Sequence, residues 1–264
     1  MELAAQRHAL SRILSTAGGR IRPRRGLRAA RVGSMWVLLV LLALAVAPLL
    51  TGCSKGPTSD VDPDQVFADS VTAMKALASF HFTYEVSAPQ GSEPAQGTRI
   101  VRIVGDVTAD GRMKAVIDVE TSGVPLQLQF VAADDTHYVQ DPTTQKWQSL
   151  PAQFSPVGRV NLNAGTIQIL EKIADPAYVA TEDVNAVQTY HMKGSVAAED
   201  VATIAGATST SEPFAGDVWI GVDDRLVHRI EILGAATSSE DPKTVRTITL
   251  SDFDEDVIIE PPQL

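Results

Sequence analysis

Cys53 is the only thiol in the 264-residue chain, and it directly follows the small residues Thr51 and Gly52 at the end of a hydrophobic run. A cysteine can act as a nucleophile, ligate a metal or carry a covalent modification. A disulfide within the chain is excluded because there is no second cysteine. None of the five histidines pairs with another at a spacing suited to a metal site. The position of Cys53 therefore favours modification of its sulfur.

The segment before Cys53 has its parts in the order of an export signal. Six arginines between Arg20 and Arg31 are followed by an uncharged run over 35–50, which is shorter than the roughly 20 residues of a membrane span. The sequence Leu-Thr-Gly-Cys at 50–53 resembles the lipobox of bacterial lipoproteins, whose cysteine receives a thioether-linked diacylglycerol. We therefore expect residues 1–52 to be a signal peptide, and the exported chain to be anchored to the outer face of the cell membrane through lipidated Cys53. An uncleaved anchor helix with a chance cysteine is the alternative.

The charge balance excludes one class of partner. Eight of the 22 basic residues and one of the 32 acidic residues precede Cys53, which leaves 14 basic and 31 acidic residues and a net charge of −17. Such a surface repels nucleic acid. The remaining 212 residues suffice for one large domain with its own core.

Residues 53–62 are rich in small and polar types and predict a flexible tether, and residues 63–264 then form a single domain. Asp62 and Pro63 predict the start of a helix over 63–79. Alternating apolar residues predict strands around 80–86, 98–108, 113–120, 126–130, 138–139 and 146–147. After a loop over 155–165, short helices are expected at 164–173, ending before Pro176, and at 197–205.

The remaining predicted strands cover 188–196, 217–222, 226–233 and 245–250, with a last edge segment at 257–260. Runs of strands with segregated helices indicate the α+β class. We expect one curved antiparallel sheet, a half-barrel, whose concave face is covered by the helices, with a hydrophobic cavity between them.

Motifs of catalysis are absent from the sequence. There is no Gly-x-Ser-x-Gly elbow, glycine-rich phosphate loop or His-Glu-x-x-His pair. Asp60, Asp62 and Asp64 have the spacing that opens a calcium loop, but the glycine and the bidentate glutamate are missing, so we interpret them as tether charge and helix cap. The acidic cluster at 252–256 is interpreted as a solvated turn, with a weak cation site as the alternative. The histidines at 81, 137 and 191 are expected on the solvent face or in turns, and His228 in the core. We expect no catalytic residue, metal or cofactor.

The apolar faces are the remaining candidates for function. On helical and strand periodicity, fifteen side chains point into one space between sheet and helices. They are Phe67, Val71, Met74, Phe82, Tyr84, Ile117, Val119, Leu126, Leu128, Phe130, Ile167, Leu170, Leu226, Ile230 and Ile232. Periodicity alone allows either a filled core or a ligand cavity. Aromatic residues make up only 5% of the chain, and this scarcity of bulky side chains favours a cavity slightly.

The order of several weak motifs resembles the LppX/LprA/LprF/LprG-like lipoproteins. The lipobox, the tether and the first helix are followed by matching segments at 80–84, 105–107, 218–223, 226–231, 250–253 and 258–262. The resemblance covers most of residues 50–262, and the long cationic region and the acidic surface depart from it. It implies a half-barrel that holds the acyl chains of lipids or glycolipids in a cavity and moves them from the inner membrane toward the outer envelope. It also implies no catalytic residues, and a more distant similarity to carriers of the LolA/LolB kind.

Two functions follow from these observations. The first is a non-enzymatic lipid carrier, whose partners are an acyl lipid or glycolipid, the membrane that holds Cys53, and an inner-membrane lipid transporter. The alternative is an envelope sensor or protein-interaction module on the same fold, which would use the polar outer face of the sheet. An envelope hydrolase would need a catalytic constellation that the sequence does not contain.

Overall fold

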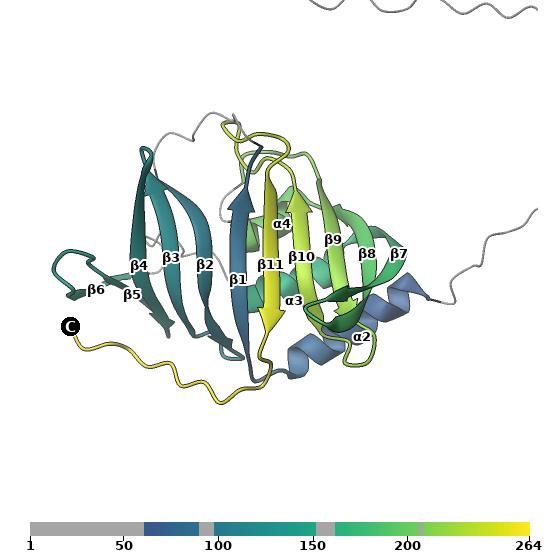
Figure 1. Cartoon of the computed structure of the whole chain (residues 1–264), viewed down its shortest axis with the longest axis horizontal. Helices are drawn as coiled ribbons and strands as arrows, with labels where there is room; N and C mark the ends of the chain where they lie inside the picture. Colours follow the sequence, from purple (N-terminus) through teal and green to yellow (C-terminus); the bar gives the residue numbers. More distant parts are fainter. Residues whose placement is uncertain (1–60, 90–97, 152–161, 206–207) are drawn as a thin grey trace, which may run out of the picture. The chain divides into compact units, whose positions relative to one another are not determined.

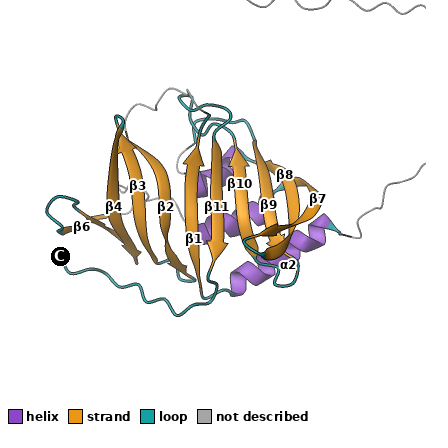
Figure 2. Ribbon diagram, viewed as in Figure 1, coloured by secondary structure: helices purple, strands orange, loops and turns teal. Residues whose placement is uncertain are grey.

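The computed structural model describes residues 61–89, 98–151, 162–205 and 208–264. These residues belong to one compact unit, residues 58–264, which carries its own hydrophobic core. In the described ranges, eleven strands form one antiparallel sheet in the order β6-β5-β4-β3-β2-β1-β11-β10-β9-β8-β7, and three helices pack on one face of it (Figure 1, Figure 2). The fold is therefore α+β with a single sheet, as the sequence predicts.

The elements follow one another in a simple pattern along the chain. One helix is followed by six strands, then a helix and two strands, then a helix and three strands. Their bounds are α2 Pro63–Ala76, β1 Ser79–Ser87, β2 Thr98–Thr108, β3 Met113–Thr121, β4 Val124–Ala133, β5 Thr136–Gln140, β6 Trp147–Pro151, α3 Leu162–Lys172, β7 Ala174–Val184, β8 Val187–Val196, α4 Ala198–Ala205, β9 Phe214–Gly221, β10 Val227–Leu233 and β11 Val245–Ser251.

Helix α2 begins where the sequence predicts. The Asp62 side chain accepts hydrogen bonds from the backbone N–H groups of Asp64 and Gln65, and Pro63 occupies the first helical position. The helix ends at Ala76 rather than at 79, because Leu77 has an extended backbone and β1 begins two residues later. Its buried residues, Val66, Phe67, Ser70 and Met74, form one stripe.

The central strands of the sheet come from segments that are far apart in the sequence. Strand β1 pairs with β2 on one side and with the last strand, β11, on the other. Phe80, Phe82 and Tyr84 of β1 are buried on the helix side, whereas the residues between them are more exposed. The sheet curves as a half-barrel around the helices, so that α2 contacts the edge strand β7 and α3 contacts β2 (Figure 1).

One strand was not predicted, and one predicted strand is wrong. Residues 174–184 form the edge strand β7, although Pro176 was expected only to end a helix. Proline is tolerated there because an edge strand leaves one row of N–H groups unpaired, and β7 has two irregularities in its pairing with β8. Residues 257–260 form no strand.

The tail that replaces this expected strand has another role. Ile259 is buried on the outer face of the sheet against Val131 and Ala133 of β4, and its carbonyl accepts a hydrogen bond from Arg112.

The helix α3 starts two residues before its predicted position. Most of the predicted loop at 155–165 lies outside the described residues, as do Cys53 and the segment before it.

Candidate functional site

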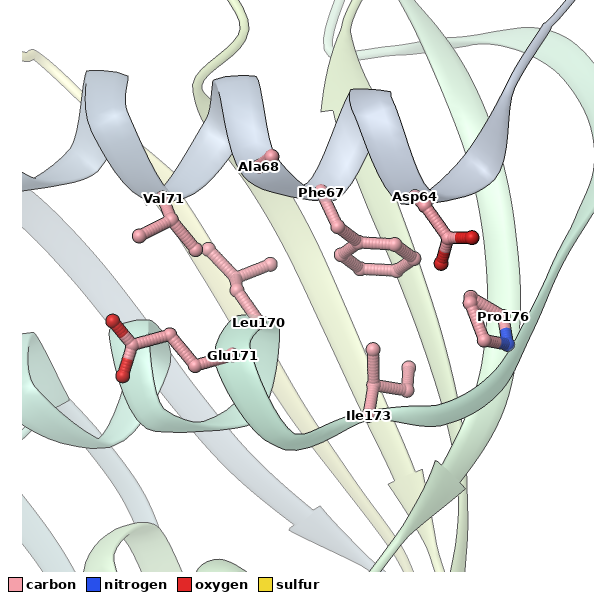
Figure 3. Close-up of a pocket in the computed structure, with 8 residues that line it drawn as sticks. All are labelled: Asp64, Phe67, Ala68, Val71, Leu170, Glu171, Ile173 and Pro176. Atoms are coloured by element: carbon pink, nitrogen blue, oxygen red, sulfur yellow. The ribbon is translucent and has the colours of Figure 1, made fainter.

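A pocket of about 390 Å³ lies between α2, the end of α3 and the first residues of β7. Figure 3 shows Phe67 of α2 and Ile173, just after α3, pointing into the space between the two helices, with Asp64 and Glu171 at opposite ends. The walls are otherwise apolar. The lining residues are Asp64, Phe67, Ala68, Val71, Leu170, Glu171, Ile173 and Pro176.

Local sequence explains how these side chains meet. Residues 64, 67, 68 and 71 are spaced by three or four positions, so they share one face of α2. Leu170 and Glu171 belong to the last turn of α3, and Ile173 continues from it into β7. Pro176 adds a wall from the edge strand. Three predicted residues, Phe67, Val71 and Leu170, are brought together here.

The two carboxylates give the pocket a polar rim. Glu171 forms an ion pair with Lys75 of α2, with 2.6 Å between Nζ and Oε1, which joins the two helices at the surface. Both side chains are about half exposed, so the pair contributes only about 0–1 kcal/mol to stability. The rim therefore offers charge to a headgroup, while the walls offer apolar surface to a chain.

Most of the other predicted residues lie in the core between sheet and helices. Met74 of α2 and seven residues of the sheet are buried in one contiguous cluster, and three more are partly buried against it. The sheet residues are Phe82, Tyr84, Ile117, Val119, Phe130, Ile230 and Ile232, and the partly buried residues are Leu128, Ile167 and Leu226. These side chains contact one another, and the pocket lies to one side of them.

Two predicted positions differ from the expected enclosed lining. Leu126 is on the same face as Val119, its cross-strand neighbour, but 41% of its surface is exposed. Alternation gives the face of a strand, not whether a helix covers it. Leu226 precedes β10, and a bulge between Val227 and Arg229 shifts the alternation. As a result, Val227 is fully buried in place of Leu226.

A buried polar cluster on the helix side of the sheet was missed by the sequence reasoning. Arg246 of β11 is directly opposite Val86 and Ile232, and its guanidinium donates to Glu240 and to the carbonyl of Gly234. Burial raises the pKa of the nearby Tyr84 to about 12, although Arg246 acts in the opposite direction. The signal in the sequence was the parity of Arg246, which alternates with Ile248 and Leu250.

The histidines occupy three kinds of position. His137 is buried edge-on against Phe130, and burial lowers its pKa, so its prediction as a solvent-face residue is wrong. His228 is buried and hydrogen-bonded to Asp224 at 3.0 Å, as expected of a core histidine. His81 and His191 are on the outer face beside Asp106 and Asp217.

Neither a metal cluster nor a membrane-crossing helix is found among the described residues. No group of three or more His, Cys, Asp or Glu side chains there is placed to hold a metal ion. In the predicted acidic cluster, Asp254 accepts a hydrogen bond from the backbone N–H of Ala78, and Ser79 donates to the carbonyl of Glu255. These contacts fasten the chain after β11 to the start of β1. No helix in the described ranges is long and apolar enough to cross a membrane.

The fold and the pocket define a class: a single antiparallel sheet wrapped around helices, with a pocket between two of the helices and an edge strand. The family model of the LppX_LprAFG lipoproteins matches residues 62–259, and the chain belongs to this family. It is 27% identical over 237 residues to the lipoarabinomannan carrier protein LprG of Mycolicibacterium smegmatis, covering 85% of this chain and 94% of that protein.

Solved structures agree on the fold. The crystal structure of LprF from Mycobacterium bovis matches with a TM-score of 0.61 at 18% identity, covering 76% of this chain and 96% of LprF. Lipoprotein LppX from Mycobacterium tuberculosis matches with a TM-score of 0.54 at 19% identity, covering 75% of this chain and all of LppX. The family thus predicted from the sequence is confirmed.

Proposed function

We propose that this protein is a non-enzymatic carrier that binds the acyl chains of lipids or glycolipids and moves them across the cell envelope. The observation that carries the proposal is the pocket between α2, α3 and β7, six of whose eight lining residues are apolar, in a chain of a lipoprotein family. The name of the LprG relative, a lipoarabinomannan carrier, supports a glycolipid as ligand.

The physical basis is the transfer of alkyl chain out of water. Each buried methylene contributes about 0.8 kcal/mol, and the walls of Phe67, Val71, Leu170 and Ile173 provide the surface for it. The volume of about 390 Å³ is near the lower end of the range for small-molecule sites. This space suits part of one alkyl chain, and a ligand with several chains requires α2 and α3 to separate further from the packed core.

The anchoring part of the proposal rests on the sequence. Residues 1–52 direct export, Cys53 carries the lipid, and residues 53–62 tether the domain of 63–264 to the outer face of the cell membrane. An inner-membrane lipid transporter is the expected source of the ligand. Cys53→Ser should move the protein from the membrane fraction to the soluble fraction of its source cell. Membrane retention of a Ser variant that has lost residues 1–52 would contradict lipid anchoring.

The carrier function is tested by native mass spectrometry of protein purified from its source. Adducts with the masses of acyl lipids are expected, together with saturable binding of a fluorescent fatty-acyl probe to the delipidated protein. Lipid-free protein that does not bind the probe would refute the proposal. Capture of a protein partner without any lipid would instead support the alternative, an envelope sensor.

A further inference from the structure

The pocket lies where the folded domain begins. Four of its eight lining residues, Asp64, Phe67, Ala68 and Val71, come from the first nine residues of α2. Asp64 follows Cys53 by only eleven positions in the sequence. A flexible linker of about ten residues has a root-mean-square reach of about 16–19 Å. A membrane anchor at Cys53 would therefore keep this pocket within a short distance of the bilayer.

The other end of the chain is fastened at the opposite side of the sheet. Pro176 of the pocket belongs to β7, one edge strand, whereas Ile259 is buried against Val131 and Ala133 of β4, close to the other edge strand, β6. Figure 1 shows the C-terminus beside β6 and α2 beside β7. Attachment through the C-terminus would thus present a different side of the molecule to a membrane.

Resting on the carrier function, we propose that the mouth of the α2–α3 pocket faces the bilayer that anchors the chain, and that an acyl chain enters it directly from that bilayer. Lysine and carboxylate groups at the rim, Lys75 with Glu171 and Asp64, suit the level of lipid headgroups. Exposure of an alkyl chain costs about 0.8 kcal/mol per methylene. A mouth held at the bilayer surface shortens the length of chain that crosses water, so the N-terminal tether accelerates loading.

The experiment compares points of attachment on one protein. Residues 53–264 with Cys53→Ser receive a hexahistidine tag either before residue 53 or after Leu264. Each form is attached to phosphatidylcholine vesicles that contain a nickel-chelating lipid and a self-quenched phospholipid with a fluorescent acyl chain. The rate of dequenching reports extraction of the probe lipid. In solution, both forms should bind a fluorescent fatty-acyl probe equally well.

The N-terminally attached form is expected to extract the lipid several-fold faster than the C-terminally attached form. A 40-residue Gly-Ser spacer inserted after residue 57 lengthens the linker from about ten to about fifty residues. It should lower the faster rate about tenfold, because effective concentration falls roughly as the −3/2 power of linker length. Ala68→Trp, which fills the pocket, should abolish the advantage of N-terminal attachment.

Equal extraction rates for the two points of attachment would overturn the inference, and so would an N-terminal advantage that survives Ala68→Trp. Either result leaves the carrier function intact, provided that the two forms without Ala68→Trp bind the fatty-acyl probe in solution. Loss of probe binding by both forms in solution would instead refute the carrier function, and the inference with it.

Discussion

Ala68→Trp should weaken acyl binding without unfolding the protein. Ala68 is exposed at the surface of α2 and lines the pocket, so an indole there projects into the space that we assign to an alkyl chain. A volume of about 390 Å³ holds about a dozen methylenes, if each occupies about the 30 Å³ of a liquid water.

The expected loss of binding free energy follows from the share of the pocket that the indole occupies. The pocket is partly open, so about half of the methylene surface leaves water, which corresponds to about 5 kcal/mol at about 0.8 kcal/mol for each methylene. An indole that occupies half of the space removes about 2–3 kcal/mol. The Kd for a fatty-acyl ligand should rise roughly 30- to 150-fold.

Displacement of a fluorescent fatty-acyl probe by fatty acids of increasing length measures this loss. The wild-type affinity should rise about twofold per methylene, because about half of the surface of each methylene leaves water, and should level off near a dozen carbons; the variant should level off earlier. Ala76→Trp is the matched control, because Ala76 is exposed on the same helix but is outside the pocket lining. Both variants should melt within a few degrees of wild type. Unchanged binding by Ala68→Trp would refute the assignment of this pocket.

Three further predictions concern stability, measured by chemical denaturation. Arg246→Ala should cost about 1–3 kcal/mol, because the partly buried Glu240 carboxylate and the Gly234 carbonyl both lose the hydrogen bonds of the buried guanidinium; a cost below about 0.5 kcal/mol would show that the pair is dispensable. For His137, burial lowers the pKa in the folded state, so its contribution is complete above about pH 6.5 and is lost as the pH falls toward the folded-state pKa. His137→Phe should flatten the dependence of the unfolding free energy on pH in this range. An unaltered slope would contradict the lowered pKa of His137. Gly105→Ala should cost about 1–3 kcal/mol or more, because a Cβ there would lie 2.2 Å from the Lys114 carbonyl oxygen; wild-type stability would mean that β2 and β3 separate easily.

Local patterns in the sequence determined most of the elements. The cap at Asp62 and the proline after it are short-range signals, and they placed the start of α2 correctly. Alternation identified the buried face of β1 and β3, because successive side chains on a strand point to opposite faces. The same rule placed Leu126 on the correct face, although its side chain is partly exposed there.

Only the tertiary structure decided which of these faces are covered and where the pocket lies. β7 was missed because its proline and polar residues suit an edge strand, which lacks the alternation of a half-buried one. The pocket needs α2, α3 and β7 to meet although residues 64 and 176 are more than 100 positions apart, and no short-range pattern records such a contact. Side-chain period and capping act over a few residues and are therefore readable from sequence, whereas coverage depends on how distant segments pack.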